Sequence, residues 1–433
     1  MSREMKYSGI AWIGDIPKSW EVRKMRTLGS FSASGIDKLI NPDEPLVRII
    51  NYVDVYNNGK YELRQKDYMI VSATPEKITE HQVQIGDMIL TPSSETIDDI
   101  GVSSVVMEEL PNTAYSYHVL RFRSKIALDL YFKKYLTNNR FVAQYFSSHC
   151  NGTIRKTVSR EVFKECPVII PPLAEQKAIA GFLDKKCNEI DELVALQEKM
   201  IEELKAYKQS VITEAVCKGL NPNVPMKDSG IEWIGNIPSD WRTDILSVLF
   251  YEHKLKNKGM AEQNLLSLSY GNIIRKDITQ SGGLLPESFE TYNIVDKDDI
   301  IFRLTDLQND KRSLRTGLCK ERGIITSAYI AIRKRTNIHA PYFHYLFHTY
   351  DLCKVFYGLG DGVRQGMNYV DMRKLPLIIP SYAEQKAIAD FLDKKCNEID
   401  QLIAIKQQKI VELNDYKKSL IYEYATGKKE VKL

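Results

Sequence analysis

Hydrophobic residues spaced three and four apart run through two long segments of the chain and predict two long helices. The first segment, Glu175 to Cys217, contains no proline and a single glycine, Gly181, and it follows Pro171 and Pro172. Its spacing is that of a coiled-coil seam. The predicted seam positions are Ile179, Leu183, Ile190, Leu193, Met200, Leu204, Tyr207 and Val211 in the first segment, and Ile388, Leu392, Ile399, Leu402, Leu413, Tyr416 and Leu420 in the second.

Six more apolar residues widen the stripes beyond what one seam needs. A helix of about 43 residues is about 65 Å long at about 1.5 Å per residue, and one with a wide apolar face is not stable alone in water. We therefore expect the two helices to pair antiparallel and the leftover apolar surface to bind a partner; a plain helical hairpin that serves only as core is the alternative. The six residues are Phe182, Val194, Ile201, Phe391, Ile403 and Ile410.

The segments before each helix contain short apolar or alternating runs that predict strands, with polar loops between them. Helices are expected at Leu130 to Phe146 and at Pro341 to Tyr357. The fold class is α/β, with α+β as the alternative. The predicted strands are Leu46–Ile50, Met88–Leu90, His118–Phe122, Leu265–Leu268, Ile300–Phe302 and Tyr329–Ile332.

The chain is an internal repeat. The segment Ser8 to Trp20 returns as Ser229 to Trp241 with nine of thirteen positions identical, and Ala174 to Asp191 returns as Ala383 to Asp400 with seventeen of eighteen identical. We call the first pair the opening motifs. The regions between them have diverged, which suggests one frame that carries two recognition surfaces. The predicted division is a globular domain at 1–170, a spacer helix at 171–220, a second globular domain at 221–379, and a second spacer helix with a basic tail at 380–433.

Composition excludes several classes of protein. No run of 18 apolar residues and no signal-peptide core is present, which predicts a cytoplasmic protein with no membrane segment. The seven cysteines form no CxxC pair, and no Cys/His cluster has the spacing of metal ligands. The net charge of +4 discriminates poorly, but residues 303–335 carry nine basic and three acidic residues, whereas residues 91–123 carry two basic and five acidic.

Polar loops after two of the predicted strands are candidates for contacts with DNA bases. Their amide, guanidinium, hydroxyl and carboxylate groups match base edges in the major groove; the alternative is a solvated loop. Basic residues at matching places before each helix suit phosphate contacts, or ion pairs near the helix starts. The tryptophans of the opening motifs, Trp12, Trp20, Trp233 and Trp241, are interpreted as packing anchors rather than platforms for base stacking. The predicted DNA-contacting residues are Ser93, Ser94, Glu95, Thr96, Arg155 and Lys156, and Thr305, Asp306, Gln308, Asn309, Lys311, Arg312, Arg315, Arg364 and Gln365.

The opening motif Ser-Gly-Ile-x-Trp-Ile-Gly-x-Ile-Pro-x-x-Trp and the closing motif Pro-(Pro/Ser)-x-Ala-Glu-Gln-Lys-Ala-Ile-Ala, each present twice, resemble those of specificity subunits of type I restriction-modification systems. The resemblance covers Tyr7 to Gly427. Ser381, where the first copy has Pro172, departs from the first closing motif and puts only the local turn in doubt.

The resemblance implies that each variable region is a target-recognition domain for one half of a bipartite, asymmetric site in double-stranded DNA. It further implies two methyltransferase subunits as partners, which carry S-adenosylmethionine, and restriction subunits that use ATP and Mg²⁺. No cofactor or metal is expected on this chain.

The sequence shows no motif of its own for catalysis, neither a glycine-rich cofactor loop nor a phosphate-binding loop. We therefore expect a non-catalytic subunit. A stand-alone DNA-binding regulator and a coiled-coil scaffold remain alternatives.

Overall fold

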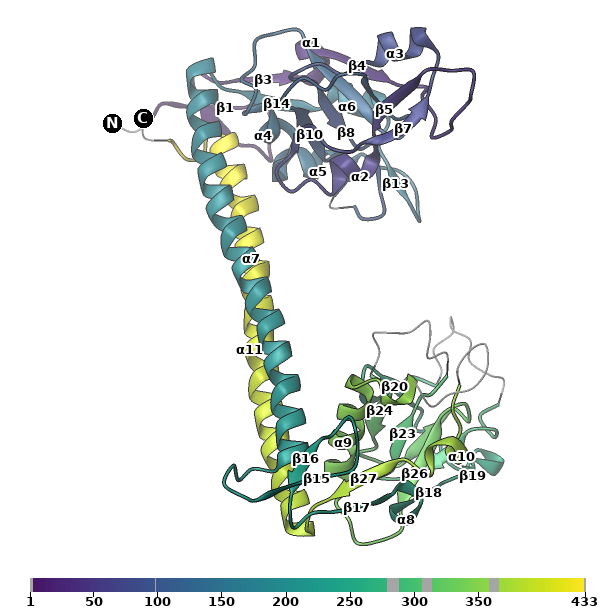
Figure 1. Ribbon diagram of the computed structural model, residues 1–433. Coiled ribbons are helices and arrows are strands. Elements are labelled where there is room, and N and C mark those ends of the chain that lie inside the picture. The colour runs from purple at the N-terminus through teal and green to yellow at the C-terminus, as the bar shows by residue number, and fades with distance from the viewer. Residues whose placement is uncertain (1–2, 98, 279–287, 306–313, 358–365, 432–433) are drawn as a thin grey trace. The chain divides into compact units, whose positions relative to one another are not determined.

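The structure is a computed structural model that describes residues 3–97, 99–278, 288–305, 314–357 and 366–431 (Figure 1). The chain forms two compact units. The first unit comprises Met1–Glu198 and Gln408–Leu433, and the second comprises Lys199–Gln407. Each unit therefore contains one variable region together with one end of each long helix.

The two long helices are α7 (Leu173–Lys218) and α11 (Tyr382–Ala425). Gly219 and Gly427 follow them with φ of 75° each, a backbone conformation that favours glycine at a helix end. The predicted helices are confirmed.

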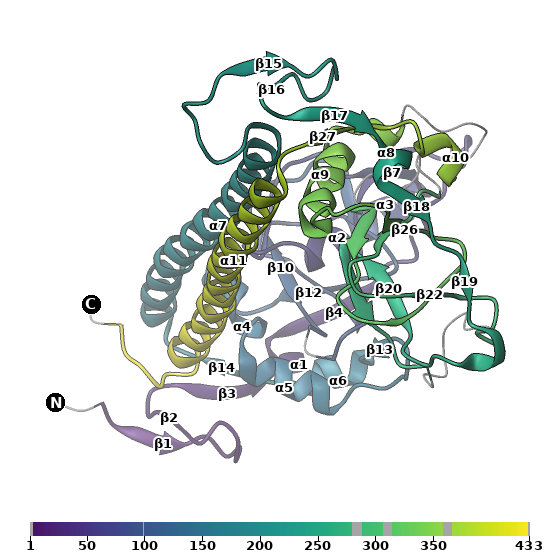
Figure 2. The same cartoon turned by 90° about the horizontal axis from the view of Figure 1, so that it is seen from below.

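Within each unit, α7 and α11 lie side by side (Figure 1, Figure 2). In the first unit the rings of Phe182 and Tyr424 are 4.4 Å apart, and Lys417 Nζ donates to Asp191 Oδ1 at 2.7 Å. Because the residue numbers rise along α7 while those of its contacts fall along α11, the helices are antiparallel. In the second unit Lys208 Nζ donates to Asp400 Oδ1 at 2.7 Å, the same ion pair with the two helices exchanged.

The predicted phase of the seam is wrong in the middle of the helices. Leu193 is 46 % exposed, whereas Ile201 is 6 % exposed. Adjacent residues point about 100° apart around a helix, so of Leu193 and Val194 only one can face the other helix. Val194 is half-buried, so it is the residue that faces α11. The seam of contacts between the two helices continues from Val194 to Ile201. Ile403 and Ile410 of α11, the counterparts of Val194 and Ile201, are both half-buried.

The variable region of the first unit is built on a five-stranded and a three-stranded sheet. Most strand pairs are antiparallel, but β10 (Ser103–Val106) with β6 (Glu62–Leu63) and β11 (Thr113–Tyr115) with β5 (Leu46–Ile50) are parallel. The expected helix from Leu130 to Phe146 is split, because Asn139 caps a new helix by accepting from Val142 N. The sheet orders are β4-β12-β8-β10-β6 and β11-β5-β7, from β4 (Gly29–Ala33), β12 (Leu120–Ser124), β8 (Met88–Leu90), β10 (Ser103–Val106), β6 (Glu62–Leu63), β11 (Thr113–Tyr115), β5 (Leu46–Ile50) and β7 (Met69–Ser72), with the further pairs β1 (Met5–Tyr7) and β2 (Asp15–Pro17), β3 (Glu21–Lys24) and β14 (Pro167–Ile170), and β9 (Ser93–Ser94) and β13 (Lys156–Thr157). The helices are α1 (Met25–Leu28), α2 (Tyr52–Tyr56), α3 (Pro75–His81), α4 (Lys133–Thr137), α5 (Arg140–Ser148) and α6 (Arg160–Glu165).

The second unit repeats this plan with differences in its sheets. The predicted strand Ile300–Phe302 is confirmed, and the predicted helix from Pro341 is α9, which ends earlier, at Leu352. The sheet orders are β18-β26-β23-β24 and β19-β22-β25, from β18 (Phe250–Glu252), β26 (Ile330–Lys334), β23 (Ile300–Phe302), β24 (Thr316–Leu318), β19 (Leu255–Lys256), β22 (Asn293–Val295) and β25 (Gly323–Ile325), with the pairs β15 (Met226–Asp228) and β16 (Asn236–Pro238), β17 (Arg242–Ile245) and β27 (Pro376–Ile379), and β20 (Leu266–Ser269) and β21 (Asn272–Arg275). The helices are α8 (Leu246–Leu249), η1 (Lys258–Met260), α9 (Ala340–Leu352), η2 (Val355–Tyr357) and α10 (Tyr369–Met372).

The same contacts join the opening and closing motifs in both units. The buried indole of Trp20 donates to Glu175 Oε2 at 2.9 Å, and that of Trp241 donates to Glu384 Oε1 at 3.3 Å. A buried indole N–H needs such an acceptor. Trp20 and Trp241 are therefore the predicted packing anchors. Trp12 packs only in part: it is 51 % exposed, with its ring 6.5 Å from that of buried Phe141.

The glutamine of each closing motif completes the joint. Gln176 accepts from Asp129 N at 2.9 Å and donates to Pro171 O at 2.8 Å. Gln385 makes the equivalent bonds with His339 N and Pro380 O. Each buried amide thus fixes the start of a long helix to the variable region before it.

We predict that the two tryptophans of the first opening motif differ in their effect on stability. Trp20→Ala removes a buried indole and leaves Glu175 without this donor, so it should lower the free energy of unfolding by about 3–5 kcal/mol. Trp12→Ala should cost less than about 1 kcal/mol, because the side chain is half exposed. Denaturant unfolding of the two variants measures both values; equal losses would contradict the assigned roles.

Candidate nucleic-acid interface

In the first unit, the two groups of residues predicted to contact DNA lie on one surface. β9 pairs antiparallel with β13, with Lys156 opposite Ser94 and Thr157 opposite Ser93. Val158 N donates to Pro92 O at 2.8 Å beside this ladder. The polar loop after β8 and the basic pair Arg155–Lys156 therefore form a single site, although they are far apart in the sequence.

The residues of this site differ in exposure. Glu95, Thr96 and Arg155 are exposed, and Ser93 and Lys156 are half-buried. Ser94 does not fit the prediction of a base contact, because its side chain is buried and its Oγ accepts from Thr96 N at 3.3 Å. Its role is to shape the turn that presents its neighbours.

Two tyrosines that the sequence reasoning missed complete the site. The guanidinium of Arg155 lies 5.7 Å from the ring centre of Tyr52, and the Tyr52 ring stacks on Tyr56 at 5.1 Å. Tyr56 donates to Asp99 Oδ2 at 3.1 Å, and Thr96 Oγ1 donates to the same oxygen at 3.0 Å. Burial raises the pKa of Tyr52, while its hydrogen bond with Ser94 opposes the rise.

This network holds Arg155 in place while leaving it exposed. Such a cation–π contact restricts the side chain without neutralising its charge. The signal available in the sequence was the pair of tyrosines four residues apart, which share one face of α2 directly after β5.

In the second unit, most of the predicted residues lie outside the described part of the chain. These are Asp306, Gln308, Asn309, Lys311, Arg312, Arg364 and Gln365. Their flanks are described: Thr305 is exposed, and Met367 N donates to Leu304 O at 2.9 Å. This bond is the counterpart of the one from Val158 to Pro92, so the segments that lead into 306–313 and out of 358–365 lie next to each other.

Arg315 is buried and does not fit the prediction of a DNA contact. Its side chain is 1 % exposed. It donates to the carbonyl oxygens of Arg303 at 3.3 Å and Thr305 at 3.0 Å, and it lies over the ring of Tyr357. Arg315 therefore ties together the two ends of the candidate loop.

An ion pair fixes the strand before each candidate loop. Arg123 binds both oxygens of Asp87 at 2.7 Å, and Arg333 binds both oxygens of Asp299 at 2.7 Å. The same carboxylates accept from the backbone of Gln84 and Asp296. Bidentate, partly buried pairs of this kind have a defined geometry, so the turns that lead into β8 and β23 are held alike.

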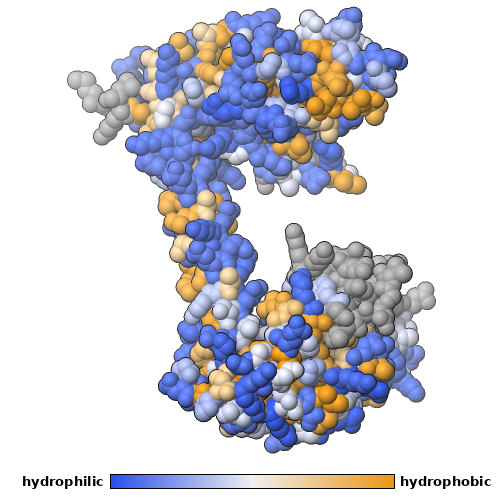
Figure 3. Space-filling view, in the orientation of Figure 1, coloured by the Kyte–Doolittle hydropathy of each residue, from blue (hydrophilic) through white to orange (hydrophobic). Residues whose placement is uncertain are grey.

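The surface of the paired helices carries exposed apolar residues, visible as patches between hydrophilic ones (Figure 3). Of the predicted partner-binding residues, Phe391 is exposed, Phe182 packs on Tyr424, and Ile201 is buried. The exposed apolar residues lie about a quarter turn around each helix from the seam, and we call them the apolar stripe. In the first unit the stripe comprises Leu193, Leu196 and Tyr416, and in the second unit it comprises Leu402, Ile405 and Tyr207.

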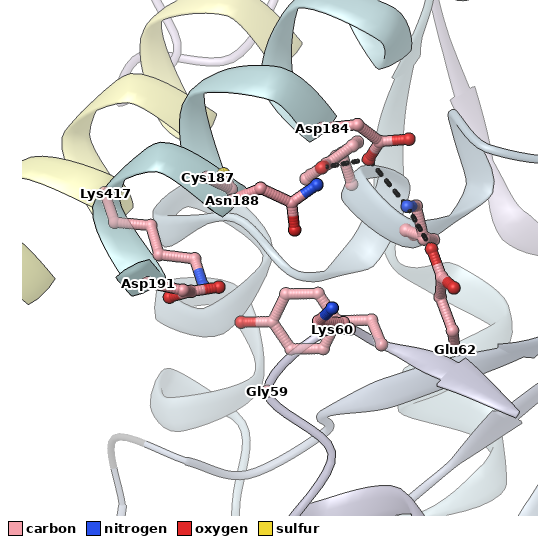
Figure 4. A pocket seen from close by; sticks show the side chains of 11 residues that line it. Gly59, Lys60, Glu62, Asp184, Cys187, Asn188, Asp191 and Lys417 are labelled. Carbon is pink, nitrogen blue, oxygen red and sulfur yellow. Dashed lines mark hydrogen bonds and ion pairs between the residues drawn. The ribbon is translucent and has the colours of Figure 1, made fainter. Parts of the chain in front are cut away.

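A cavity of about 70 Å³ in the first unit lies between the variable region and the helices (Figure 4). Its charged groups compensate each other: buried Lys134 pairs with Glu62 at 2.7 Å and with Asp184 at 2.6 Å. Burial raises the pKa of the Cys187 thiol, which therefore stays protonated. The cavity joins the variable region to α7, and its lining residues include no activated nucleophile.

Among the described residues, His253, Asp296 and Asp299 offer possible metal ligands within 4.8 Å of one another. Arg333 donates to both carboxylates at 2.7 Å, so the positive charge that they balance is its guanidinium. Of the helices in the described ranges, none has the length and apolar character needed to cross a membrane.

Comparison with known proteins identifies the family. Residues 17–206 and 253–415 match the type I restriction modification DNA specificity domain. The chain is 25 % identical over 431 residues to the MjaX type I restriction enzyme specificity subunit of Methanocaldococcus jannaschii, covering 97 % of this chain and 96 % of that one. It is 24 % identical over 446 residues to the MjaVIII specificity subunit of the same organism, covering 96 % and 94 %.

Solved structures share the fold. A chain from a structural study of complex assembly in a type I R-M system has a TM-score of 0.66 at 12 % identity, covering 95 % of this chain and 99 % of that one. The HsdS subunit from Thermoanaerobacter tengcongensis has a TM-score of 0.52 at 13 % identity, covering 95 % and 97 %.

The chain belongs to the family of type I restriction-modification DNA specificity proteins. Members are non-catalytic subunits that recognise DNA. The resemblance read from the opening and closing motifs is confirmed.

We predict that Arg155 and Arg315 separate DNA affinity from stability. Arg155→Ala should weaken binding to every DNA sequence and lower the slope of log K against log salt by about 0.9, the value for one phosphate contact. Its free energy of unfolding should change by less than about 1 kcal/mol, because the side chain is exposed. Arg315→Ala should instead destabilise the second unit by about 3 kcal/mol, because buried carbonyl groups lose their donor. Binding titrations at several salt concentrations, with thermal unfolding beside them, distinguish the two; an unfolding loss for Arg155→Ala alone would contradict the assignment.

Proposed function

We propose that the two units read the two halves of one bipartite, asymmetric DNA site. The observation that carries this proposal is that one frame is built twice. The bonds Trp20–Glu175 and Val158–Pro92 in the first unit recur as Trp241–Glu384 and Met367–Leu304 in the second. Equivalent bonds hold loops of different sequence. Each unit would therefore offer a different set of polar side chains to DNA, from the same position in its fold.

The division of labour follows from the chemistry of the loops. In the first unit Glu95 and Thr96 can reach base edges, a carboxylate accepting from cytosine and a hydroxyl serving several bases. In the second unit the loop of Gln308, Asn309 and Arg312 offers the paired groups that recognise adenine and guanine. Arg155 and Arg364 would contact phosphates and fix the register.

The paired helices would set the distance between the half-sites and carry the enzymatic partners. The apolar stripe leaves large side chains such as Leu196 and Ile405 in contact with water, which is typical of a protein–protein interface. Two methyltransferase subunits, one on each unit, would bind there and bring S-adenosylmethionine. Restriction subunits that use ATP and Mg²⁺ would join through them.

The other candidate functions are a stand-alone regulator and a coiled-coil scaffold. A regulator that acts alone has no need of the apolar stripe, and a scaffold has no need of two unlike polar loops on one frame. Purification from the host decides between them: two methyltransferase subunits per chain support the proposal, and a chain that purifies alone and still binds its site tightly supports the regulator.

We predict that replacing Gln308 or Arg312 by alanine relaxes the methylation motif at one half-site only. Each base contact is worth about 1–3 kcal/mol, so the discrimination at one position should fall by at least about tenfold. Methylome sequencing of a host that carries each variant reads both half-sites at once. Thr96→Ala is the matched variant for the other half-site. If both halves loosen together, or neither does, these loops are not the readers.

We predict that charge on the apolar stripe prevents assembly. Leu193→Glu with Leu196→Glu should remove one methyltransferase subunit, and Leu402→Glu with Ile405→Glu should remove the other, because a buried unpaired carboxylate is costly. Ala195→Glu, exposed on the same helix but outside the stripe, is the control and should assemble normally. Native mass spectrometry counts the subunits, and full assembly of both stripe variants would refute the docking site.

A further inference from the structure

The second unit contains a strained tyrosine at the tip of a hairpin. β20 and β21 pair antiparallel, with Ser269 opposite Asn272, so that Tyr270 and Gly271 alone form the turn. Tyr270 has φ of 45° and Gly271 has φ of 80°. Two positive φ values in a two-residue turn are those of a type I′ turn, where the first position favours asparagine, aspartate or glycine. A bulky side chain there has an energetic cost.

Tyr270 also lacks the burial that would offset this cost. Its side chain is 73 % exposed, the highest value among the tyrosines of the described chain. An aromatic ring gains stability mainly by burial, so neither the backbone nor packing explains a tyrosine at this place. A residue held in an unfavourable conformation with its ring in water is a candidate for contact with a ligand.

The position of the hairpin indicates the ligand. Leu268 and Ile273 of the hairpin lie against Gly317 of β24, the strand that follows the candidate DNA loop. Gly271 lies so close to Leu314 that an added Cβ would be 3.0 Å from the Cβ of Leu314. The tip of the hairpin is therefore next to the residue at which the 306–313 segment returns to the described chain.

In the first unit a tyrosine also comes soon after the strand that matches β20, although it begins a helix there rather than a hairpin turn. β5 pairs in parallel with β11, and the start of β20 makes a parallel bridge with β25 through Leu265 and Ile324. Tyr52 is the second residue after β5, and Tyr270 is the first residue after β20. Tyr52 belongs to the candidate DNA site of the first unit, because Arg155 lies over its ring.

We propose that Tyr270 contacts the DNA of the second half-site with its exposed ring. This inference rests on the proposed function of the second unit. In the major groove, the apolar feature that a ring can pack on is the methyl group of thymine. Such a contact would add affinity at one half of the site only.

The test uses Tyr270→Asn and Tyr270→Phe in the chain purified with its partners. Asparagine suits the turn, so Tyr270→Asn should keep or raise the thermal midpoint. It should weaken binding to the cognate duplex about tenfold, and it should leave unchanged the binding to a duplex whose second half-site is scrambled. Tyr270→Phe keeps the ring and should bind as the unchanged protein does.

Three results would overturn the proposal. Tyr270→Asn could bind both duplexes as the unchanged protein does, lose affinity equally for both, or lose affinity together with its thermal midpoint. The cognate site is first defined by the methylome of the host with and without this chain. If no methylation depends on the chain, the proposed function itself fails, which distinguishes that failure from a failure at Tyr270.

Discussion

The hydrogen bond between a buried tryptophan and the glutamate of a closing motif organises the rest of the structure. It connects the point where the chain enters each variable region with the point where the chain leaves it. Trp20 and Glu175 are bonded in the first unit, and Trp241 and Glu384 in the second. Because both ends of a variable region are fixed at one place on a long helix, the residues between them can differ in sequence and number without moving that place. The near identity of the motifs and the divergence between them have this single physical cause.

The frame extends from this joint to the bases of the candidate loops. The pairs of Asp87 with Arg123 and of Asp299 with Arg333 fix the turns before β8 and β23. Past those strands, the bonds from Val158 to Pro92 and from Met367 to Leu304 hold the loop bases. Each polar loop thus leaves a rigid support, and this limits the entropy that its side chains lose on binding DNA. The side chains of the frame hold the loops in place, and the polar side chains of the loops are the ones available to contact DNA.

The sequence predicted the helices, several strands and the family, because heptad spacing and repeated motifs are local signals. It did not predict the phase of the seam. Leu193 and Val194 are both apolar, and only packing against α11 selects Val194. Arg315 was misread for a similar reason: a basic residue in a polar loop has the same local pattern whether it points to solvent or holds carbonyl groups inside. Tyr52 was missed because its partner Arg155 lies far along the chain, and only the fold brings them together.

The candidate DNA sites of the two units differ in the charge and in the aromatic residues that surround them. In the first, the segment 91–123 is acidic, and the candidate site depends on a stack in which Tyr56, Tyr52 and Arg155 hold one another in place. In the second, residues 303–335 carry nine basic and three acidic residues, of which Arg315 is buried and Arg333 pairs with Asp299. Tyr270 stands exposed there on a strained turn, without an arginine over its ring among the described contacts. A preorganised cation needs little help from long-range charge, whereas a basic segment attracts DNA before any contact forms. The two candidate surfaces therefore differ in what favours DNA binding: a preorganised arginine in the first unit, and the charge of a basic segment in the second.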